Sequence, residues 1–352
     1  MEYVGFDLGK VNSQICLLTE DGELVEKRLK TERETLAQFF GRRSEKVCIL
    51  IEASTESEWV ARCLEELGHE VIVADPNFAP MYATRSKKVK TDRRDARALC
   101  EACRLGAYRT AHRISDEARA TKNLLAVREQ LVLTRSRYIS FAKSLLRGEG
   151  LRLNSVDADR LSRKLEAMEL PAVLRQTLTP LIAAMKTLDE QIVIADKELE
   201  RLAADNETVK RLQTVPGVGI ITATSFAAVI DNVERFETAK QVRMYLGLVP
   251  SENSSGERQQ RGRLTKTGNR RLRYLLVEAA WSLLRSKKPD TAKLQKWTQA
   301  IAGRRGKQIA VVALARKLAG ILYAMWRDGT EFGIAGGESQ LMTTGSELSL
   351  RE

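Results

Sequence analysis

Residues 46–52 read Lys46-Val47-Cys48-Ile49-Leu50-Ile51-Glu52. This run stays apolar until it ends on a carboxylate, which is the pattern of a central strand buried on both faces of a sheet. Shorter strand patterns lie before and after it, at residues 3–7, 14–18, 23–29 and 70–75. Stretches with helical spacing separate or follow these strands, at residues 32–42, 57–67 and 92–105. The order predicts an α/β domain, with a mixed sheet and helices packed on its faces.

The first predicted strand ends on Asp7, and the central apolar strand ends on Glu52. If these strands are parallel neighbours, their carboxyl ends lie side by side, where open α/β sheets place ligands. The predicted helix from residue 92 begins with Asp92 and Asp95, which are three residues apart and therefore share one helix face. We expect this helix to bring both aspartates to the same sheet edge.

Four carboxylates this close together require a metal or protonation. Mg²⁺ takes oxygen ligands, and a pair of such ions can clamp the attacking and leaving oxygens of a phosphodiester. The sequence therefore predicts a catalytic, metal-binding quartet of Asp7, Glu52, Asp92 and Asp95, holding two Mg²⁺ ions. Taken singly, each residue also has a structural explanation, as a turn residue, a strand-end charge or an acid at the positive end of a helix.

The chain of 352 residues is strongly basic, with 58 Lys and Arg against 46 Asp and Glu and a formal net charge of +12. An excess of this kind favours an anionic partner, with nucleic acid first, although solvated surface charge is the alternative. Five scattered cysteines and the lack of a secretory signal pattern predict reduced thiols in the cytoplasm. We expect no membrane partner, because no apolar run looks long enough to span a bilayer.

The middle of the chain, residues 113–210, has two runs of apolar residues with alternating spacing of four and three. Ser115 is a candidate N-cap for the first run. The runs predict coiled-coil seams, listed here by position: 120, 124, 127, 131, 134, 138, 141 and 145, then 181, 185, 188, 192, 195, 199 and 202. Pro180 falls before the second seam and is assigned to the connection. The two helices could return as an antiparallel hairpin or pair with another protomer. We expect a projecting arm that makes the protein a homodimer or homotetramer, and an ordinary helical bundle fits the pattern equally well.

The second informative block runs from Tyr245 to Arg273 and contains Ser254-Ser255-Gly256. Seven cations lie between residues 251 and 273, against two acids. A serine ringed by arginines could attack a phosphodiester, given a base or metal to activate it, although Ser-Ser-Gly is usually only loop. Together with the basic run around Asp92, the predicted nucleic-acid-binding residues are Lys87, Lys88, Lys90, Arg93, Arg94, Arg258, Arg261, Arg263, Lys266, Arg270, Arg271 and Arg273.

The element order and the acidic quartet resemble the RNase H-like nuclease fold, in the version of the Holliday-junction resolvase RuvC. More specifically, Phe6-Asp7-Leu8-Gly9 and Thr91-Asp92-Arg93-Arg94-Asp95-Ala96 resemble the DEDD transposases of the "IS one-ten" insertion-sequence family. The stretches 247–250, 254–256 and 267–270 are similar to the second domain of the same family.

This resemblance implies an insertion-sequence transposase that cuts and rejoins donor and target DNA through a covalent phosphoserine. It implies that Ser255 is the catalytic nucleophile, with Ser254 as the alternative, and that a structured guide RNA from the element takes part. The expected domains are a RuvC-like metal domain at 1–112, a coiled-coil middle at 113–210, a mainly α transposase domain at 211–327 and a disordered tail at 328–352. Two other hypotheses remain: a junction endonuclease that uses only the quartet, and a non-catalytic nucleic-acid binder.

Overall fold

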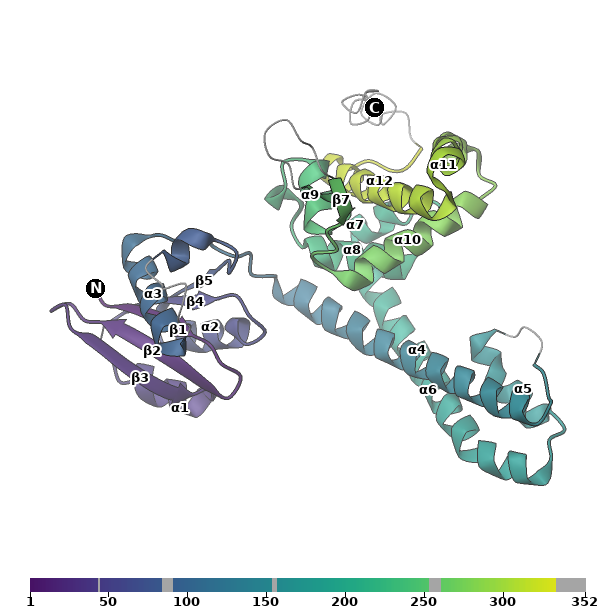
Figure 1. Ribbon diagram of the computed structural model, residues 1–352, viewed down its shortest axis with the longest axis horizontal. Helices are drawn as coiled ribbons and strands as arrows, with labels where there is room; N and C mark the ends of the chain where they lie inside the picture. Colours follow the sequence, from purple (N-terminus) through teal and green to yellow (C-terminus); the bar gives the residue numbers. More distant parts are fainter. Residues whose placement is uncertain (44, 84–90, 154–156, 253–260, 334–352) are drawn as a thin grey trace. The chain divides into compact units, whose positions relative to one another are not determined.

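The computed structural model describes residues 1–43, 45–83, 91–153, 157–252 and 261–333 (Figure 1). The chain divides into two compact units, Met1–Ile114 and Ser115–Glu352, and each is described by itself. The predicted division of the second unit, at about residue 210, remains a prediction.

The first unit is built on a five-stranded sheet in the order β3-β2-β1-β4-β5. Its strands are β1 Tyr3–Asp7, β2 Asn12–Leu18, β3 Leu24–Lys30, β4 Cys48–Glu52 and β5 Glu70–Ala74. The first three form an antiparallel meander, whereas β1, β4 and β5 are parallel, with Phe6 opposite Ile51. The predicted mixed sheet is confirmed, and the strands that end at Asp7 and Glu52 are parallel neighbours.

Helices cover both faces of this sheet (Figure 1). On one face, α1 Arg33–Phe40 and α2 Ser57–Glu66 pack against fully buried side chains of the central strands, including Phe6 and Ile49. On the other face, α3 Asp92–Leu105 and the short 3₁₀ helix η1 Ala79–Tyr82 pack against Leu50 and its neighbours. All five cysteines are free and buried, in agreement with the expectation of reduced thiols.

The second unit begins with two long helices, α4 Asp116–Gly148 and α6 Ala172–Ala204, with η2 Ala158–Arg160 and α5 Leu161–Ala167 between them. The Ser115 hydroxyl accepts a hydrogen bond from the Ala118 amide, so the predicted N-cap is confirmed. The long helices pair antiparallel within the chain, because Arg128 forms an ion pair with Asp196 and Arg135 forms one with Asp189. The sequence allowed either an antiparallel hairpin or pairing with another protomer, and within this chain the two helices form the hairpin.

Two details of this arm differ from the sequence expectation. Pro180 lies inside α6 rather than in the connection, and the buried Leu178 and Ile182 on either side hold the helix continuous across the missing backbone hydrogen bond. On α4, Val127 and Phe141 of the expected seam are 58% and 57% exposed. The reason is that α4 turns Arg128 and Arg135 toward the aspartates of α6, which moves the packed stripe by about one position.

The remaining helices of the second unit form a core around α12 Lys307–Asp328. They are α7 Glu207–Leu212, α8 Ile220–Ile230, η3 Val233–Arg235, α9 Ala239–Tyr245, α10 Arg270–Arg285, η4 Pro289–Thr291 and α11 Ala292–Arg305, with a hairpin of β6 Pro250–Glu252 and β7 Arg261–Leu264. This part is mainly helical, as predicted.

Two corrections concern the end of the chain. Contrary to the expectation, α12 is long and apolar enough to span a bilayer, but 61% of its most apolar window is buried in this core, so packing explains its composition. The expected disordered tail does not begin at residue 328, because the Phe332 amide donates to the Thr214 hydroxyl and the Phe332 ring packs on the core. Residues 334–352 lie outside the described part.

Candidate active site

The backbone of α3 lies directly on β1 in the first unit. A Cβ added at Gly5 would be 2.1 Å from the Ala96 carbonyl oxygen and 2.1 Å from the Cys100 amide nitrogen. Further along, the Cys100 thiol donates to the Tyr3 carbonyl. The helix therefore runs opposite to the strand, and only glycine at position 5 allows this approach.

This contact fixes where the acidic residues of α3 lie along the strand. Four residues of helix before Ala96 cover about 6 Å, and two residues of strand after Gly5 cover about 6.6 Å. Asp92 is thus level with Asp7 at the carboxyl end of β1. The Thr91 hydroxyl accepts from the Arg94 amide and starts the helix there, so both aspartates lie in its first turn. Asp95 is only 6% exposed.

The strand residues of the quartet belong to the face that α3 covers. Side chains alternate along a strand, so Asp7 shares the face of Gly5, and Glu52 shares the face of Leu50, which packs toward α3. The hydroxyl of Tyr82, in η1 on that same face, donates to the Glu52 carboxylate. The backbone thereby places two strand ends and one helix start, all acidic, at one edge of the sheet.

The donor chemistry at this edge fits a hard divalent cation, which prefers carboxylate oxygens. Within the described residues, however, no three His, Cys, Asp or Glu side chains converge closely enough to form a ready ligand group. The Glu52 carboxylate in particular is engaged by Tyr82. Fold and register thus bring the quartet to one edge, and its metal-binding role remains a prediction.

The basic residues next to the quartet are partly occupied within the chain. Arg93 and Arg97 both donate to the carboxylate of Glu26 on β3, and these hydrogen bonds lower the pKa of Glu26. Both guanidinium groups stay more than half exposed, so Arg93 keeps surface for a second contact. Lys87, Lys88 and Lys90 lie outside the described residues.

In the second unit, two glycine turns lock together the segments that flank the β6–β7 hairpin. A Cβ at Gly247 would be 2.2 Å from the Thr267 carbonyl oxygen, and one at Gly268 would be 2.1 Å from the Tyr245 carbonyl oxygen. Both glycines have positive φ, at 65° and 72°, which favours glycine for a second reason. Arg273 donates to the Leu246 and Thr267 carbonyls and joins the same two turns. The root of the hairpin is therefore rigidly built, and the segment with Ser254, Ser255 and Arg258 lies outside the described residues.

The predicted cations around this hairpin fall into two groups. Arg263, Lys266 and Arg270 are exposed. In contrast, Arg271 forms an ion pair with Glu129 at 3.4 Å, and Arg273 is used for the turn contacts above. The exposed group is the better candidate for phosphate contacts.

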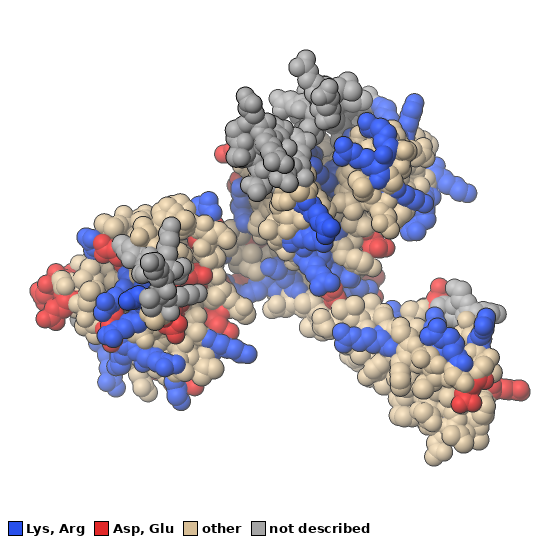
Figure 2. Space-filling model, in the orientation of Figure 1, with Lys and Arg blue, Asp and Glu red and all other residues tan. Residues whose placement is uncertain are grey.

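The sequence interpretation missed a further basic stretch at residues 285–307. It contains eight cations and one acid, Asp290. The cations, all exposed, are Arg285, Lys287, Lys288, Lys293, Lys296, Arg304, Arg305 and Lys307. Figure 2 shows Lys and Arg side chains gathered over α11, where this stretch lies. The excess of positive charge in this stretch is visible in the sequence and could have identified it as a candidate nucleic-acid-binding surface.

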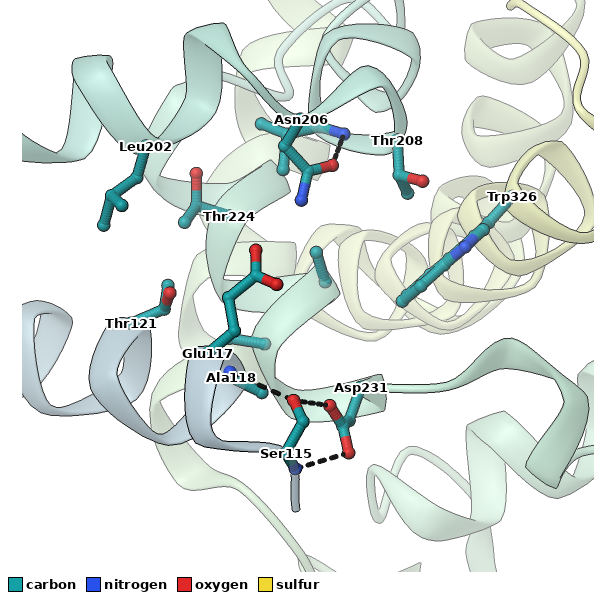
Figure 3. A pocket seen from close by; sticks show the side chains of 13 residues that line it. Ser115, Glu117, Ala118, Thr121, Leu202, Asn206, Thr208, Thr224, Asp231 and Trp326 are labelled. Carbon is teal, nitrogen blue, oxygen red and sulfur yellow. Dashed lines mark hydrogen bonds between the residues drawn. The ribbon is translucent and has the colours of Figure 1, made fainter.

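A cavity of about 120 Å³ lies elsewhere in the second unit, where the first turn of α4 meets α6, α7, α8 and α12 (Figure 3). Glu117, Thr224 and Trp326 are among its lining residues, and the Thr224 hydroxyl is buried without a hydrogen-bond partner. Beside it, Ser115 donates its backbone amide and its hydroxyl to Asp231. None of the predicted site residues lines this cavity. It lies at the base of the α4–α6 hairpin and is not part of the acidic edge of the sheet.

A mixed sheet of this order, with acidic residues at the carboxyl ends of its central strands, is compatible with the RNase H-like class of DEDD transposases. Comparison with known families agrees: residues 4–149 match a DEDD transposase profile, and residues 209–296 match the profile described as "Transposase IS116/IS110/IS902 family".

Full-length relatives carry the same description. The chain is 32% identical to "Transposase for insertion sequence element IS1111A" of Coxiella burnetii, over 92% of this chain and 89% of the relative. It is 31% identical to "Probable family 20 transposase" of Pseudomonas aeruginosa, over 92% of this chain and 96% of the relative. It is 30% identical to "Transposase for insertion sequence element IS1328" of Yersinia enterocolitica, over 94% and 98%. The chain belongs to the IS110 family of DEDD transposases, which are enzymes that act on DNA, and the resemblance drawn from the sequence is confirmed.

Proposed function

We propose that this transposase is a serine recombinase that joins donor and target DNA strands through a covalent phosphoserine intermediate, with Ser255 as nucleophile. The observation that carries the proposal is the contact of α3 on Gly5, which gathers two acidic pairs at one sheet edge. The glycine-locked hairpin root in the second unit supports it, because it gives the serine segment a rigid base. Family membership makes DNA the substrate.

In this proposal, Asp7, Glu52, Asp92 and Asp95 would hold two Mg²⁺ ions, which would supply positive charge beside the phosphodiester. The Ser255 hydroxyl oxygen attacks phosphorus, a new P–O ester bond forms and one strand leaves with a free hydroxyl. The serine proton would pass to a carboxylate of the quartet, and the oxygen of the leaving strand would take up a proton in turn, so that the strand ends in a hydroxyl. Attack by the hydroxyl of the incoming strand then releases the serine and restores a DNA phosphodiester, so no energy source is needed.

The histidines do not offer a better base. The His69 ring is 6% exposed, with Nδ1 accepting from the Val47 amide and Nε2 within 3.1 Å of the Phe40 carbonyl oxygen. Both nitrogens are therefore engaged in the core of the first unit. His112 lies in the segment just before the second unit, outside both acidic and serine blocks.

We also propose that a structured RNA encoded by the element guides the choice of donor and target, in a homo-oligomer whose protomers share active sites. The basic surfaces on α10 and α11 support a polyanion partner. RNA that copurifies from cells carrying the native flanking DNA, and that restores activity when added back, would be the expected result.

The test of the proposed chemistry is strand joining in vitro with labelled donor, target, copurified RNA and Mg²⁺. Asp7→Asn and Ser255→Ala should each abolish joined products. A mixture of the two variants should recover part of the activity if protomers share sites. Cleavage without joining that persists in Ser255→Ala would indicate instead a nuclease that uses only the acidic quartet.

A further inference from the structure

A pair of basic side chains lies where α9 packs on α12, outside every region assigned above. The guanidinium of Arg243 on α9 sits over Gly320 of α12, where an added Cβ would be 2.3 Å from one of its Nη atoms. Lys317, one turn earlier on α12, places its ammonium 4.5 Å from the centre of the Trp297 ring. Because Gly320 has no side chain, the Arg243 guanidinium has room at this point on α12.

Within the described part of the chain, these two cations have no acidic counterpart. Among the residues that the structure describes, neither Arg243 nor Lys317 has a carboxylate within ion-pair distance, and the Arg243 Nε is buried without a hydrogen-bond partner. Burial lowers the pKa of Arg243, and neighbouring Arg316 lowers it further. Burial likewise lowers the pKa of Lys317, with Arg243 adding to the effect. Two like charges that are close together and partly desolvated cost free energy in the unbound protein. A bound anion would offset this cost, because it would supply the opposite charge and the hydrogen-bond acceptors that the two cations lack.

We infer that Arg243 and Lys317 form a seat for a backbone phosphate of a nucleic-acid strand. A planar guanidinium with free N–H donors suits phosphate oxygens, and lysine adds a point charge beside it. The exposed Trp297 ring next to Lys317 offers a surface for a base.

The seat lies partly on the helix that leads into the β6–β7 hairpin. The Leu248 amide donates to the Arg243 carbonyl, so Arg243 lies in the last turn of α9, and the turn that follows this helix leads into β6. A phosphate bound there would hold the strand beside the hairpin. The inference rests on the proposed function only in taking nucleic acid as the anion.

The test measures binding alone, in full-length Ser255→Ala protein, so that its outcome does not depend on the chemistry. Fluorescein-labelled single-stranded DNA, duplex DNA and RNA oligonucleotides are titrated by anisotropy at several salt concentrations. Arg243→Gln and Lys317→Met remove one charge each, and the methionine keeps an apolar chain over Trp297. Gly320→Ala keeps every charge but displaces the guanidinium. Arg327→Gln, on the same helix and paired with Asp328, is the matched control.

We expect Arg243→Gln and Lys317→Met each to weaken binding of at least one oligonucleotide about tenfold, the lower range for a hydrogen bond to a charged group. Each should also lower the salt slope by about 1. Gly320→Ala should weaken binding similarly, and Arg327→Gln should not. The Tm of Arg243→Gln, Lys317→Met and Gly320→Ala should stay at or above the Tm of the parent protein. The oligonucleotide affected tells whether the strand is DNA or RNA.

Two results would overturn the inference. One is an unchanged salt slope in Arg243→Gln and Lys317→Met, with a lower Tm, which would make these residues structural. The other is wild-type binding by Gly320→Ala, which would show that the geometry of the seat is irrelevant. Failure of the serine chemistry would appear in strand joining and not in this assay.

Discussion

Gly5 and Ala96 are in backbone contact, so close that a single methyl group on Gly5 would overlap the Ala96 carbonyl oxygen at 2.1 Å. This contact between residues far apart in the sequence sets the height of α3 on the sheet. It is therefore the contact that decides whether Asp92 and Asp95 reach the edge formed by Asp7 and Glu52.

Gly5→Ala should disrupt this docking. Because the obstructing atoms are backbone, α3 must shift, and we expect the free energy of unfolding to fall by at least about 2 kcal/mol, as for overpacked cores. Strand joining should be lost even below the unfolding temperature. Gly303→Ala is the control, since a Cβ there meets nothing within 4 Å. Thermal unfolding and strand joining measure both effects, and equal results for the two variants would contradict the register argument.

Asp7→Asn should remove metal binding while keeping the fold. A ligand that binds only the native state raises its Tm, so Mg²⁺ should raise the Tm of the wild-type protein and not that of the variant. Asp21→Asn, in the exposed turn after β2, should respond like wild type. The measurement is a Mg²⁺ titration of thermal unfolding, and an identical rise in all three proteins would remove Asp7 from the metal site.

Tyr82→Phe should weaken metal binding without abolishing it. The tyrosine hydroxyl donates to the Glu52 carboxylate and holds its orientation. Groups that orient a metal ligand typically contribute 10- to 100-fold, so the Mg²⁺ concentration for half-maximal strand joining should rise about tenfold. Glu52→Gln should instead lose activity at every Mg²⁺ concentration. If Tyr82→Phe had the same Mg²⁺ requirement as wild type, Tyr82 would not be orienting Glu52 for metal binding.

The cations around the β6–β7 hairpin should separate by experiment into two groups. A double change of Arg263 and Arg270 to Ala should lower the salt slope of DNA binding by about 2, since each lost phosphate contact removes about 1. Arg273→Ala should leave the slope unchanged and lower the Tm, because this arginine joins the Leu246 and Thr267 carbonyls. Anisotropy and thermal unfolding distinguish the two, and a reversed pattern would reject the division.

Glu26 should make the stability of the first unit depend on pH. Its pKa is lowered from 4.5, first by the hydrogen bond from Arg97, so the folded protein binds this proton less readily than the unfolded chain. The stabilisation is therefore present above the unfolded-state pKa and is lost as pH falls through the folded-state pKa. As the pH falls through and below the ordinary glutamate pKa of 4.5, the Tm of wild type should fall more than that of Glu26→Gln. Parallel Tm curves would show that the ion pairs contribute nothing.

The first unit could be predicted well from the sequence, because its signals are local. A continuous apolar run such as residues 46–52 predicts a buried parallel strand, and the acidic residue at its end predicts the active edge. Gly5 could not be recognised in this way. Its role depends on Ala96 and Cys100, which reach it only after the sheet and α3 have packed.

The second unit was less predictable where adjacent patterns compete. The spacing of four and three on α4 fits two neighbouring stripes, and the ion pairs of Arg128 and Arg135 select the one that faces α6. Arg243 looks like any helical arginine in the sequence. Its place over Gly320, and the lack of a carboxylate partner for it among the described residues, are properties of the tertiary structure.

The central claim is that DNA becomes covalently attached to Ser255. The most direct measurement is a denaturing gel of full-length protein incubated with labelled donor, target, copurified RNA and Mg²⁺. We predict a labelled protein band that persists in Ser254→Ala and disappears in Ser255→Ala. Strand cleavage that is unchanged in both variants, with no labelled protein at any time point, would contradict the account and leave the acidic quartet as the whole active site.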